Sequence, residues 1–397
     1  MTAETPPGPS SRLDAPSAAA RALLDHHPAL TERVRFAPLA ELPTPVERLD
    51  ALERAIGTGG ELFAKRDDRT SPIYGGNKVR TLEVLLGDAL AKGATHVYAT
   101  GACGSNHAIA TALHAPRLGL VPGAVVYPQP ESRSAADNLR VLLDRAGRQV
   151  RALPHWSALP YGIVSERRRA AARGERAVVM MPGGAIPLGA LGYVSAGLEL
   201  ASQVEAGELP RPSRVVVAVG SNCTTAGLLV GFALAARMGI GFRAGATPRP
   251  PTLVAVRVTP WPVTSRLRIV GLASATAQLL ASLAGDPGLA LPRHTLAAAL
   301  EIDGSELGPG YGFGTAAGRE ALRLAREYAG LPLELTYSAK SAAAAIARLR
   351  ARAAGPTVYW ATRSSAPLPE VGEDAVALAP PGMQRWLARA RRDERGP

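Results

Sequence analysis

The sequence predicts an α/β protein with two open, mostly parallel sheets that carry helices on both faces. Short β-branched or apolar runs alternate with helical segments along most of the 397 residues, which is the pattern of βαβ units. The run 214–219 is almost entirely apolar and Val-rich, as buried parallel strands are. The length suits two compact units, or one large α/β unit with an insertion.

The alternation defines the expected elements in order. Strands are expected at 61–65, 95–100, 124–127, 149–153, 177–181, 214–219, 253–258 and 357–360. Helices are expected at 79–92, from 108 onward, and at 135–146, 166–173, 188–205, 228–238, 275–283, 315–329 and 340–353. Residues 1–25, which are rich in proline at their start, are expected to form a mobile tail.

Composition excludes several classes of protein. The formal charge is +12, but no aromatic interleaving, zinc-ligand spacing or helix-turn-helix accompanies the basic residues, so we expect a solvated basic face and no nucleic-acid partner. No uninterrupted apolar run of about eighteen residues occurs, so no membrane span is expected. Two cysteines and no readable secretory signal favour a reducing cytoplasm.

One lysine stands out by its local sequence. Gly75, Gly76 and Asn77 precede Lys78, and an apolar-periodic segment follows it. Glycines give the backbone freedom for a tight turn and asparagine can cap a helix, so Lys78 is expected at a turn–helix junction. An isolated motif of this kind is more often a surface lysine after a loop. Its importance depends on the rest of the chain.

Four polar segments are placed where a parallel sheet binds ligands, beyond the carboxyl ends of strands: 75–78, 104–107, 220–225 and 336–338. The third is hydroxyl-rich and opens a helix, which suits phosphate, although alone it could be an ordinary strand–helix turn. A lysine with a phosphate cradle and no metal-ligand spacing indicates pyridoxal 5′-phosphate held as a Schiff base.

Six motifs carry a resemblance to a known family, in the same order from about Leu42 to Ser365. They are KRDD-x6-GGNK-x-R-x-LE, GACGSNH, GGAIPLGALGY, VVVAVGSNCTTAGL, GPGYG and YSAKS. The chain resembles the family of D-cysteine desulfhydrase and 1-aminocyclopropane-1-carboxylate deaminase, which are pyridoxal-phosphate enzymes of the tryptophan-synthase-β fold type. The resemblance implies a larger cofactor-binding unit (26–80 and 200–390), a smaller unit (81–199), a cofactor in the cleft between them, and a homodimer.

The same resemblance implies roles for single residues. Lys78 would be the Schiff-base lysine, with Asn77 beside the cofactor, and Asn106 would hydrogen-bond the cofactor's ring oxygen and lie near the substrate. Ser105 would face the substrate carboxylate or act near its α-carbon, and His107 would adjoin the substrate, with packing and capping as its alternative. The phosphate would be held by Gly220, Ser221, Asn222, Cys223, Thr224 and Thr225. Tyr311 and Tyr337 match two tyrosines that flank the substrate.

Ser338 matches the position beside the cofactor's pyridine nitrogen, where the deaminase branch carries glutamate. A hydroxyl leaves a weaker electron sink than a carboxylate. A weaker sink suffices when a good leaving group sits on the β-carbon, so Ser338 favours β-elimination from a small, D-cysteine-like amino acid. A deaminase of the 1-aminocyclopropane-1-carboxylate type and a cofactor-binding protein that has lost turnover remain alternatives.

The chain also departs from the family pattern. Thr81 stands where a cationic residue is usual, Asn222 and Cys223 stand where small residues are expected, and 183–186 reads Gly-Gly-Ala-Ile instead of Gly-Gly-Ser-Asn. After the last strand, Arg363 lies in Ala-Thr-Arg-Ser-Ser where His-Thr-Gly-Gly is usual. We expect Arg363 either to pair with an acidic group of an unusual substrate or to point outward.

Overall fold

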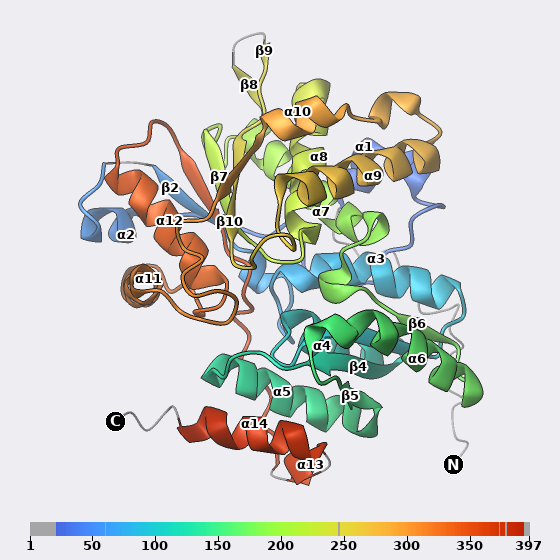
Figure 1. Ribbon diagram of the computed structural model, residues 1–397. Coiled ribbons are helices and arrows are strands. Elements are labelled where there is room, and N and C mark those ends of the chain that lie inside the picture. Colours follow the sequence, from blue (N-terminus) through green and yellow to red (C-terminus); the bar gives the residue numbers. More distant parts are fainter. Residues whose placement is uncertain (1–20, 60, 245–246, 373, 378, 393–397) are drawn as a thin grey trace, which may run out of the picture.

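Two α/β units make up the part of the chain that the computed structural model describes, residues 21–59, 61–244, 247–372, 374–377 and 379–392. Figure 1 shows one unit around β2, β7 and β10 and the other around β4 and β5, with helix α3 (Asn77–Ala91) between them. Residues 1–20 of the expected tail lie outside the described residues.

The larger sheet has the order β1-β2-β12-β7-β10-β11. Its strands are β1 (Val46–Arg48), β2 (Leu62–Lys65), β12 (Thr357–Trp360), β7 (Arg214–Val219), β10 (Thr252–Arg257) and β11 (Leu300–Asp303). Only the β1–β2 pair is antiparallel. Because β12 lies between β2 and β7, three loops far apart in sequence leave the sheet side by side.

The smaller sheet is wholly parallel, in the order β5-β4-β3-β6. Its strands are β5 (Val150–Ala152), β4 (Val121–Tyr127), β3 (His96–Ala102) and β6 (Ala177–Val179). The expected α/β class with two open, mostly parallel sheets is therefore confirmed. The expected strands are present, whereas β1 and β11, both short and partly polar, were not predicted.

Helices cover both sheets and connect the two units. Those around the larger sheet are α1 (Ala22–His26), α2 (Asp50–Ala55), α7 (Pro187–Glu205), α8 (Cys223–Met238), α9 (Arg266–Ala284), α10 (Arg293–Ala298), α11 (Ala316–Tyr328) and α12 (Ser338–Arg350). Those around the smaller sheet are α4 (Asn106–His114), α5 (Arg133–Ala146), α6 (Leu159–Ala172), α13 (Asp374–Ala377) and α14 (Pro381–Arg392). A short two-stranded sheet, β8 (Arg243–Ala244) with β9 (Thr247–Pro248), extends from the larger unit. Helix α3 contacts α7 on one side and α4 on the other.

Three helices begin at least five residues earlier than the sequence predicts. Helix α8 begins at Cys223 rather than at 228, α6 at Leu159 rather than at 166, and α9 at Arg266 rather than at 275. In α8 the first turn is polar yet buried, with Thr224 and Thr225 at the cavity between the two units, so its apolar periodicity starts only after it. Polar residues facing a site conceal a helix start from pattern analysis.

The expected boundaries between units differ from the structure. Helix α7 packs in the larger core, although its residues up to 199 were expected in the smaller unit. Residues 22–25 belong to helix α1, and Leu23 is fully buried in the larger core instead of lying in a tail. Residues up to 390 were expected in the larger unit. Helix α14 instead packs against α5 of the smaller unit, as Figure 1 shows. One face of α14 buries Met383, Trp386 and Leu387, and the Trp386 indole donates to the carbonyl of Gln129 at 2.7 Å.

One described helix, α9, is long and apolar enough to cross a membrane by length and composition alone. Its residues Ile269, Ala273, Thr276 and Leu280 are fully buried, and it packs on α7 and α8. The apolar composition of α9 is therefore accounted for by its place in the larger core.

Candidate active site

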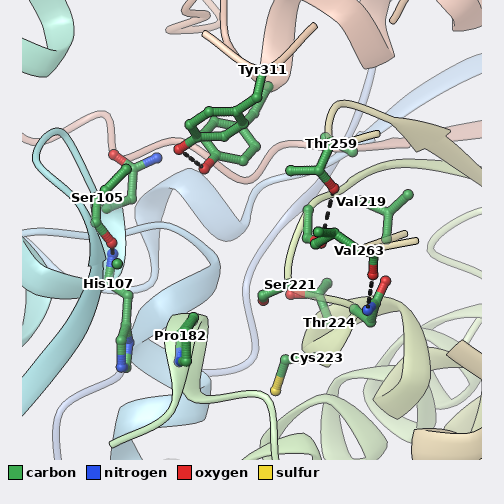
Figure 2. A pocket seen from close by; sticks show the side chains of 18 of the residues that line it. Ser105, His107, Pro182, Val219, Ser221, Cys223, Thr224, Thr259, Val263 and Tyr311 are labelled. Atoms are coloured by element: carbon green, nitrogen blue, oxygen red, sulfur yellow. Dashed lines mark hydrogen bonds between the residues drawn. The ribbon is translucent and has the colours of Figure 1, made fainter. Parts of the chain in front are cut away.

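A cavity of about 370 Å³ opens where the carboxyl ends of the strands of both units face each other. Residues 101, 102 and 105–107 line it from the smaller unit, and 218–225 and 259–263 from the larger one. Figure 2 shows Ser105 and His107 on one wall and Ser221, Cys223 and Thr224 on the facing wall. Of the residues singled out by sequence, the cavity brings together Asn77, Lys78, Ser105, Asn106, His107, Gly220, Ser221, Asn222, Cys223, Thr224, Thr225, Tyr311, Tyr337 and Arg363.

Lys78 is held by a turn that only glycine can form. Gly76 has φ +87°, and a Cβ there would lie 2.5 Å from the carbonyl oxygen of Thr362. A Cβ on Gly75 would lie 2.3 Å from the carbonyl oxygen of Asp68. The N–H of Asn77 donates to Thr362 at 3.0 Å, so the loop after β12 fixes the start of α3 and with it the stem of Lys78.

The amine of Lys78 is prepared for nucleophilic chemistry. Burial lowers its pKa below the ordinary value of 10.5, which increases the neutral fraction at any given pH. Its Nζ atom forms no hydrogen bond or ion pair with any residue that the structure describes. A neutral, partner-free amine can condense with an aldehyde or remove a proton.

The N-terminus of α8 forms an anion site. The first turn of this helix has no acidic residue, and the backbone N–H groups of a first turn have no intrahelical acceptor. The hydroxyl of Thr225 is buried without a partner among the described residues, and Thr224 accepts from the amide of Asn77 at 3.0 Å. This set of donors fits a phosphate group next to Lys78.

Helix α4 presents a second N-terminus from the smaller unit. The Ser105 hydroxyl oxygen accepts from the N–H groups of His107 (3.2 Å) and Ala108 (3.3 Å), which leaves its own proton free to donate into the cavity. The amide oxygen of Asn106 accepts from the Tyr74 hydroxyl (3.1 Å) and the Asn138 amide (2.9 Å). This network leaves the Asn106 NH₂ group available for an acceptor in the cavity.

His107 lies on the wall formed by α4. Both of its ring nitrogens are buried without a hydrogen-bond partner among the described residues. Burial and the nearby charge of Lys78 lower its pKa to about 3, so the imidazole is neutral at physiological pH. The ring therefore adds no positive charge next to Lys78, and it keeps one free acceptor nitrogen.

Tyr311 and Tyr337 close one end of the cavity, as Figure 2 shows for the labelled Tyr311 and its hydrogen-bonded neighbour. Their hydroxyl oxygens are 2.5 Å apart, and their rings meet edge to face with centroids at 5.7 Å. Burial is the largest cause that raises the pKa of each hydroxyl, so both stay protonated across the physiological range. The pair can donate a proton to a group bound between it and Lys78.

Ser338 is placed differently from the expectation. Its side chain is fully buried, does not line the cavity, and accepts from the N–H of Glu334 at 2.7 Å. The reason is that Ser338 begins α12, and Glu334 caps this helix through the N–H groups of Thr336, Tyr337 and Ser338. Glu334 itself lines the cavity. Sequence reasoning missed it, although a carboxylate just before a helix start is a capping signal.

Arg363 lines the cavity, so the expectation that it points outward is wrong. Its Nη1 atom donates to the carbonyl of Leu333 at 2.6 Å, and its backbone forms a bridge with Gly76. No described carboxylate lies within ion-pair distance of its guanidinium. Arg363 thus brings a guanidinium to the cavity lining that forms no ion pair with a described residue.

Lining residues that the sequence did not single out include Tyr127, Trp156, Trp261 and Thr259. Trp261 lies in the run Pro260–Val263, whose apolar residues are all exposed although they are consecutive in sequence. A run of consecutive apolar residues between a strand and a helix could have indicated from the sequence that this loop lines a site.

The donors fit pyridoxal phosphate and not a metal. An amine of lowered pKa lies in the same cavity as a helix N-terminus that holds the unpartnered buried hydroxyl of Thr225. The described residues contain no cluster of three His, Cys, Asp or Glu side chains that could bind a metal ion. The arrangement can hold a phosphorylated aldehyde and, through α4, a carboxylate.

Comparison with known proteins agrees with this chemistry. The sequence profile of the family "pyridoxal-phosphate dependent enzyme" matches residues 37–361. A D-cysteine desulfhydrase of Salmonella paratyphi B is 33% identical over 324 residues, which cover 80% of this chain and 90% of the relative. The nocardicin C-9′ epimerase of Nocardia uniformis is 42% identical over 202 residues, which cover 50% of this chain and 59% of the relative.

A putative 1-aminocyclopropane-1-carboxylate deaminase of Pyrococcus horikoshii is 39% identical over 213 residues, 50% of this chain and 61% of the relative. The chain thus aligns with only about three fifths of the length of these last two relatives. The crystal structure of a homologue of the deaminase superposes with a TM-score of 0.68 at 27% identity, covering 92% of this chain and all of that one. Threonine deaminase isoform 2 of Solanum lycopersicum, at 16% identity and a TM-score of 0.53, shares the fold.

Proposed function

The chain belongs to the family of pyridoxal-phosphate dependent enzymes, and we propose that it is a lyase that eliminates the β-substituent of a D-cysteine-like amino acid. The products would be a keto acid, ammonia and sulfide or an equivalent leaving group. Support comes from the D-cysteine desulfhydrase that this chain matches over 90% of that relative's length. The observation that carries the proposal is the Lys78 amine, which lies between the helix N-termini of α4 and α8.

Particular residues of the chain would hold the cofactor. The first turn of α8 and the hydroxyls of Ser221, Thr224 and Thr225 would bind its phosphate, Lys78 its aldehyde carbon, and the Asn106 NH₂ group its ring oxygen. When bound, pyridoxal phosphate supplies an electron sink conjugated to the substrate's α-carbon.

The remaining lining groups have roles in handling the substrate. The N-terminus of α4 and the Ser105 hydroxyl would bind the substrate carboxylate, since both donate into the cavity. The Lys78 amine would take the α-proton, because its lowered pKa increases the fraction of the neutral, basic form. The Tyr311–Tyr337 pair would donate a proton to the group that leaves the β-carbon.

Epimerisation is the second candidate, favoured by the 42% identity to nocardicin C-9′ epimerase. Both reactions begin when Lys78 removes the α-proton. The two reactions differ in the next step, because an epimerase returns a proton to the opposite face of the α-carbon and no group leaves.

One panel separates the candidates. Purified holoenzyme is incubated in D₂O with D- and L-cysteine, D- and L-serine, D- and L-alanine and 1-aminocyclopropane-1-carboxylate. Keto acid from cysteine or serine supports elimination, and keto acid from the cyclopropane substrate alone supports the deaminase. Deuterium at the α-carbon with inverted configuration and no keto acid supports epimerisation. Visible absorbance without exchange or keto acid would mean a cofactor-binding protein that has lost turnover.

We also propose a homodimer in the cytoplasm. The resemblance to the desulfhydrase family is the support for the dimer, and the two free, buried cysteines are compatible with a reducing compartment. Sedimentation velocity of the purified holoenzyme tests the dimer.

A further inference from the structure

Two tryptophans on the rim of the cavity are far more exposed than large aromatic side chains usually are. Trp156 is 60% exposed and Trp261 is 73% exposed, and both line the same cavity as Lys78. Trp156 follows strand β5 of the smaller unit, and Trp261 lies in the loop between β10 and α9 of the larger unit. The two indoles therefore reach one cavity from different units. Neither takes part in the chemistry assigned to the lining residues above.

The loop that carries Trp261 is fixed in place. Thr259 and Thr264, at its two ends, both donate to the carbonyl of Gly220, at 3.2 and 3.1 Å. The Asn222 amide donates to the carbonyl of Val263 at 3.0 Å. These bonds tie the exposed run Pro260–Val263 to the phosphate-binding loop, so its apolar side chains are held at the mouth.

Trp156 is held in a comparable way on the other side. It begins a 3₁₀ turn whose N-cap, His155, accepts from the N–H of Ser157 at 3.4 Å. Its only ring contact among the described residues is with His155, at a centroid distance of 5.3 Å. Trp261 has no ring contact among the described aromatic pairs. Among these residues Trp261 has no ring partner and Trp156 has only a tilted contact with His155, so faces of both indoles are available to a bound molecule.

We propose that these two tryptophans form a subsite for an aromatic β-substituent, so that the substrate is an S-aryl- or S-benzyl-cysteine type of amino acid. The inference rests on the proposed function and specifies its substrate class. The carboxylate would lie at the N-terminus of α4 and the α-carbon at Lys78, with the substituent extending toward the mouth. The two tryptophans line the same cavity as Lys78, which favours a substrate over a second protein as the molecule that contacts them.

The corresponding elimination is balanced without an added oxidant or reductant. S-phenylcysteine and one water give thiophenol, pyruvate and ammonia. The Cβ–S bond breaks with its electron pair leaving on sulfur, which takes up a proton from the Tyr311–Tyr337 pair, and the α-proton goes to Lys78. Water then supplies the keto oxygen as ammonia is released.

The test compares a substrate and a non-eliminating ligand, each with and without an aromatic ring. Thiol and pyruvate release by holoenzyme is measured for both enantiomers of S-phenylcysteine and cysteine. Binding of both enantiomers of phenylalanine and alanine, which lack a leaving group, is measured by calorimetry. The variants are Trp156→Ala, Trp261→Ala and, as the control, Tyr328→Ala, since Tyr328 is 38% exposed but does not line the cavity.

In the wild type and in Tyr328→Ala, phenylalanine should bind at least about tenfold more tightly than alanine, and kcat/KM should favour S-phenylcysteine by a similar factor. Either tryptophan variant should lose most of that preference. An equal preference in all four proteins would overturn the inference and leave the proposed elimination intact. Loss of dimer in a tryptophan variant with unchanged preference would assign the rim to a contact between copies. No keto acid from any substrate would overturn the proposed function itself.

Discussion

The reactivity of Lys78 follows from where its amine is placed. The glycine turn fixes its backbone, and its Nζ would lie 3.6 Å from a Cβ at Gly183, in a narrow space beside the 182–184 turn. Burial lowers its pKa, and neutral His107 adds no competing charge. The lysine is therefore made nucleophilic mainly by desolvation.

We predict that cofactor uptake by the apoprotein becomes faster with rising pH, with a midpoint below pH 10.5. Uptake increases with pH because only the neutral amine reacts with the aldehyde. The lowered pKa of Lys78 makes the amine neutral at a lower pH than in an ordinary lysine. Stopped-flow visible absorbance measures the rate, with Nα-acetyl-lysine as the reference amine. A midpoint equal to that of the reference would contradict the prediction. Lys78→Ala should show no such pH-dependent phase.

Arg363 is predicted to bind an acceptor group on the substrate, because it lines the cavity and has no carboxylate partner among the described residues. Arg363→Ala should raise KM at least about tenfold for the best substrate of the panel, as expected for losing a charge-assisted hydrogen bond. Steady-state kinetics measure the effect. Arg323→Ala removes an exposed arginine that pairs with Glu327 and should change nothing. Unchanged KM and kcat in Arg363→Ala would remove the proposed contact.

Two departures from the family pattern prove to be neighbours. The Thr81 hydroxyl lies 3.8 Å from the Cys223 thiol, and this thiol donates to the carbonyl of Gly184 at 3.3 Å. A Cβ at Gly184 would lie 2.5 Å from the methyl group of Thr81, so the residue at position 81 packs beneath the glycine turn. The small, neutral Thr81 and the unusual Cys223 thus form one packed unit below Lys78.

At the scale of elements, a buried ion cluster holds β2, α3 and α7 together beneath the site. Lys65, Asp67, Arg80 and Glu199 are each at most 5% exposed. The Lys65 amine donates to Glu199 at 2.5 Å, and Arg80 donates to Asp67 at 2.8 Å and to Glu199 at 2.9 Å. Since Arg80 follows Lys78 by two residues, the cluster fixes the helix that carries the reactive amine. The charged motif around Lys65 therefore has a structural role: it holds these elements in place beneath the site.

Breaking this cluster should be costly. Glu199→Gln leaves Lys65 and Arg80 buried with one partner fewer, and we expect a loss of about 3–5 kcal/mol in the free energy of unfolding, measured by urea denaturation. Asp88→Asn, which breaks only the exposed Lys92 pair, should cost at most about 1 kcal/mol. Equal costs in the two variants would show that the cluster contributes nothing beyond a surface pair.

The cluster also determines the direction in which the stability of the protein changes with pH. Burial alone would raise the pKa of Glu199, but Arg80 and Lys65 outweigh it and lower the pKa to about 2. A carboxylate with a lowered folded pKa stabilises the protein above its ordinary pKa of 4.5. This contribution should decline as the pH falls from 4.5 toward 2.

At the scale of the whole molecule, the site exists only at the junction of the two units. The smaller unit supplies the N-terminus of α4 with Asn106, and the larger unit supplies the anion site of α8. Helix α3 contacts elements of both units and begins with the Lys78 turn. A cofactor bound there would contact both units at once.

Cofactor binding should therefore stabilise both units together. At about 100 times its Kd, bound pyridoxal phosphate should add about 2.7 kcal/mol to the free energy of unfolding. Differential scanning calorimetry of apoprotein and holoprotein should show one transition shifted upward by several degrees. Lys78→Ala should show a smaller shift. An unshifted second transition would mean that one unit does not contribute to binding.

Local patterns in the sequence were sufficient for the α/β class and for most strands and helices, because alternating apolar periodicities reflect burial directly. Ligands of parallel sheets bind where a strand leads into a helix, and polar residues at such junctions can be recognised in the sequence. This holds for the Gly-Gly-Asn-Lys turn, Ser105-Asn106 and the loop 220–225. The family motifs added Tyr311 and Tyr337, which spacing alone would have left as ordinary core residues.

Only the tertiary structure decided which side chains face the cavity. Ser338 and Glu334 are four residues apart, and helix capping directs the hydroxyl into the core and leaves the carboxylate on the wall. Trp156 and Trp261 come from different units, and nothing local to either reveals that they share a mouth. Side-chain direction and the meeting of distant loops depend on how the two sheets pack, and that packing is a property of the whole chain.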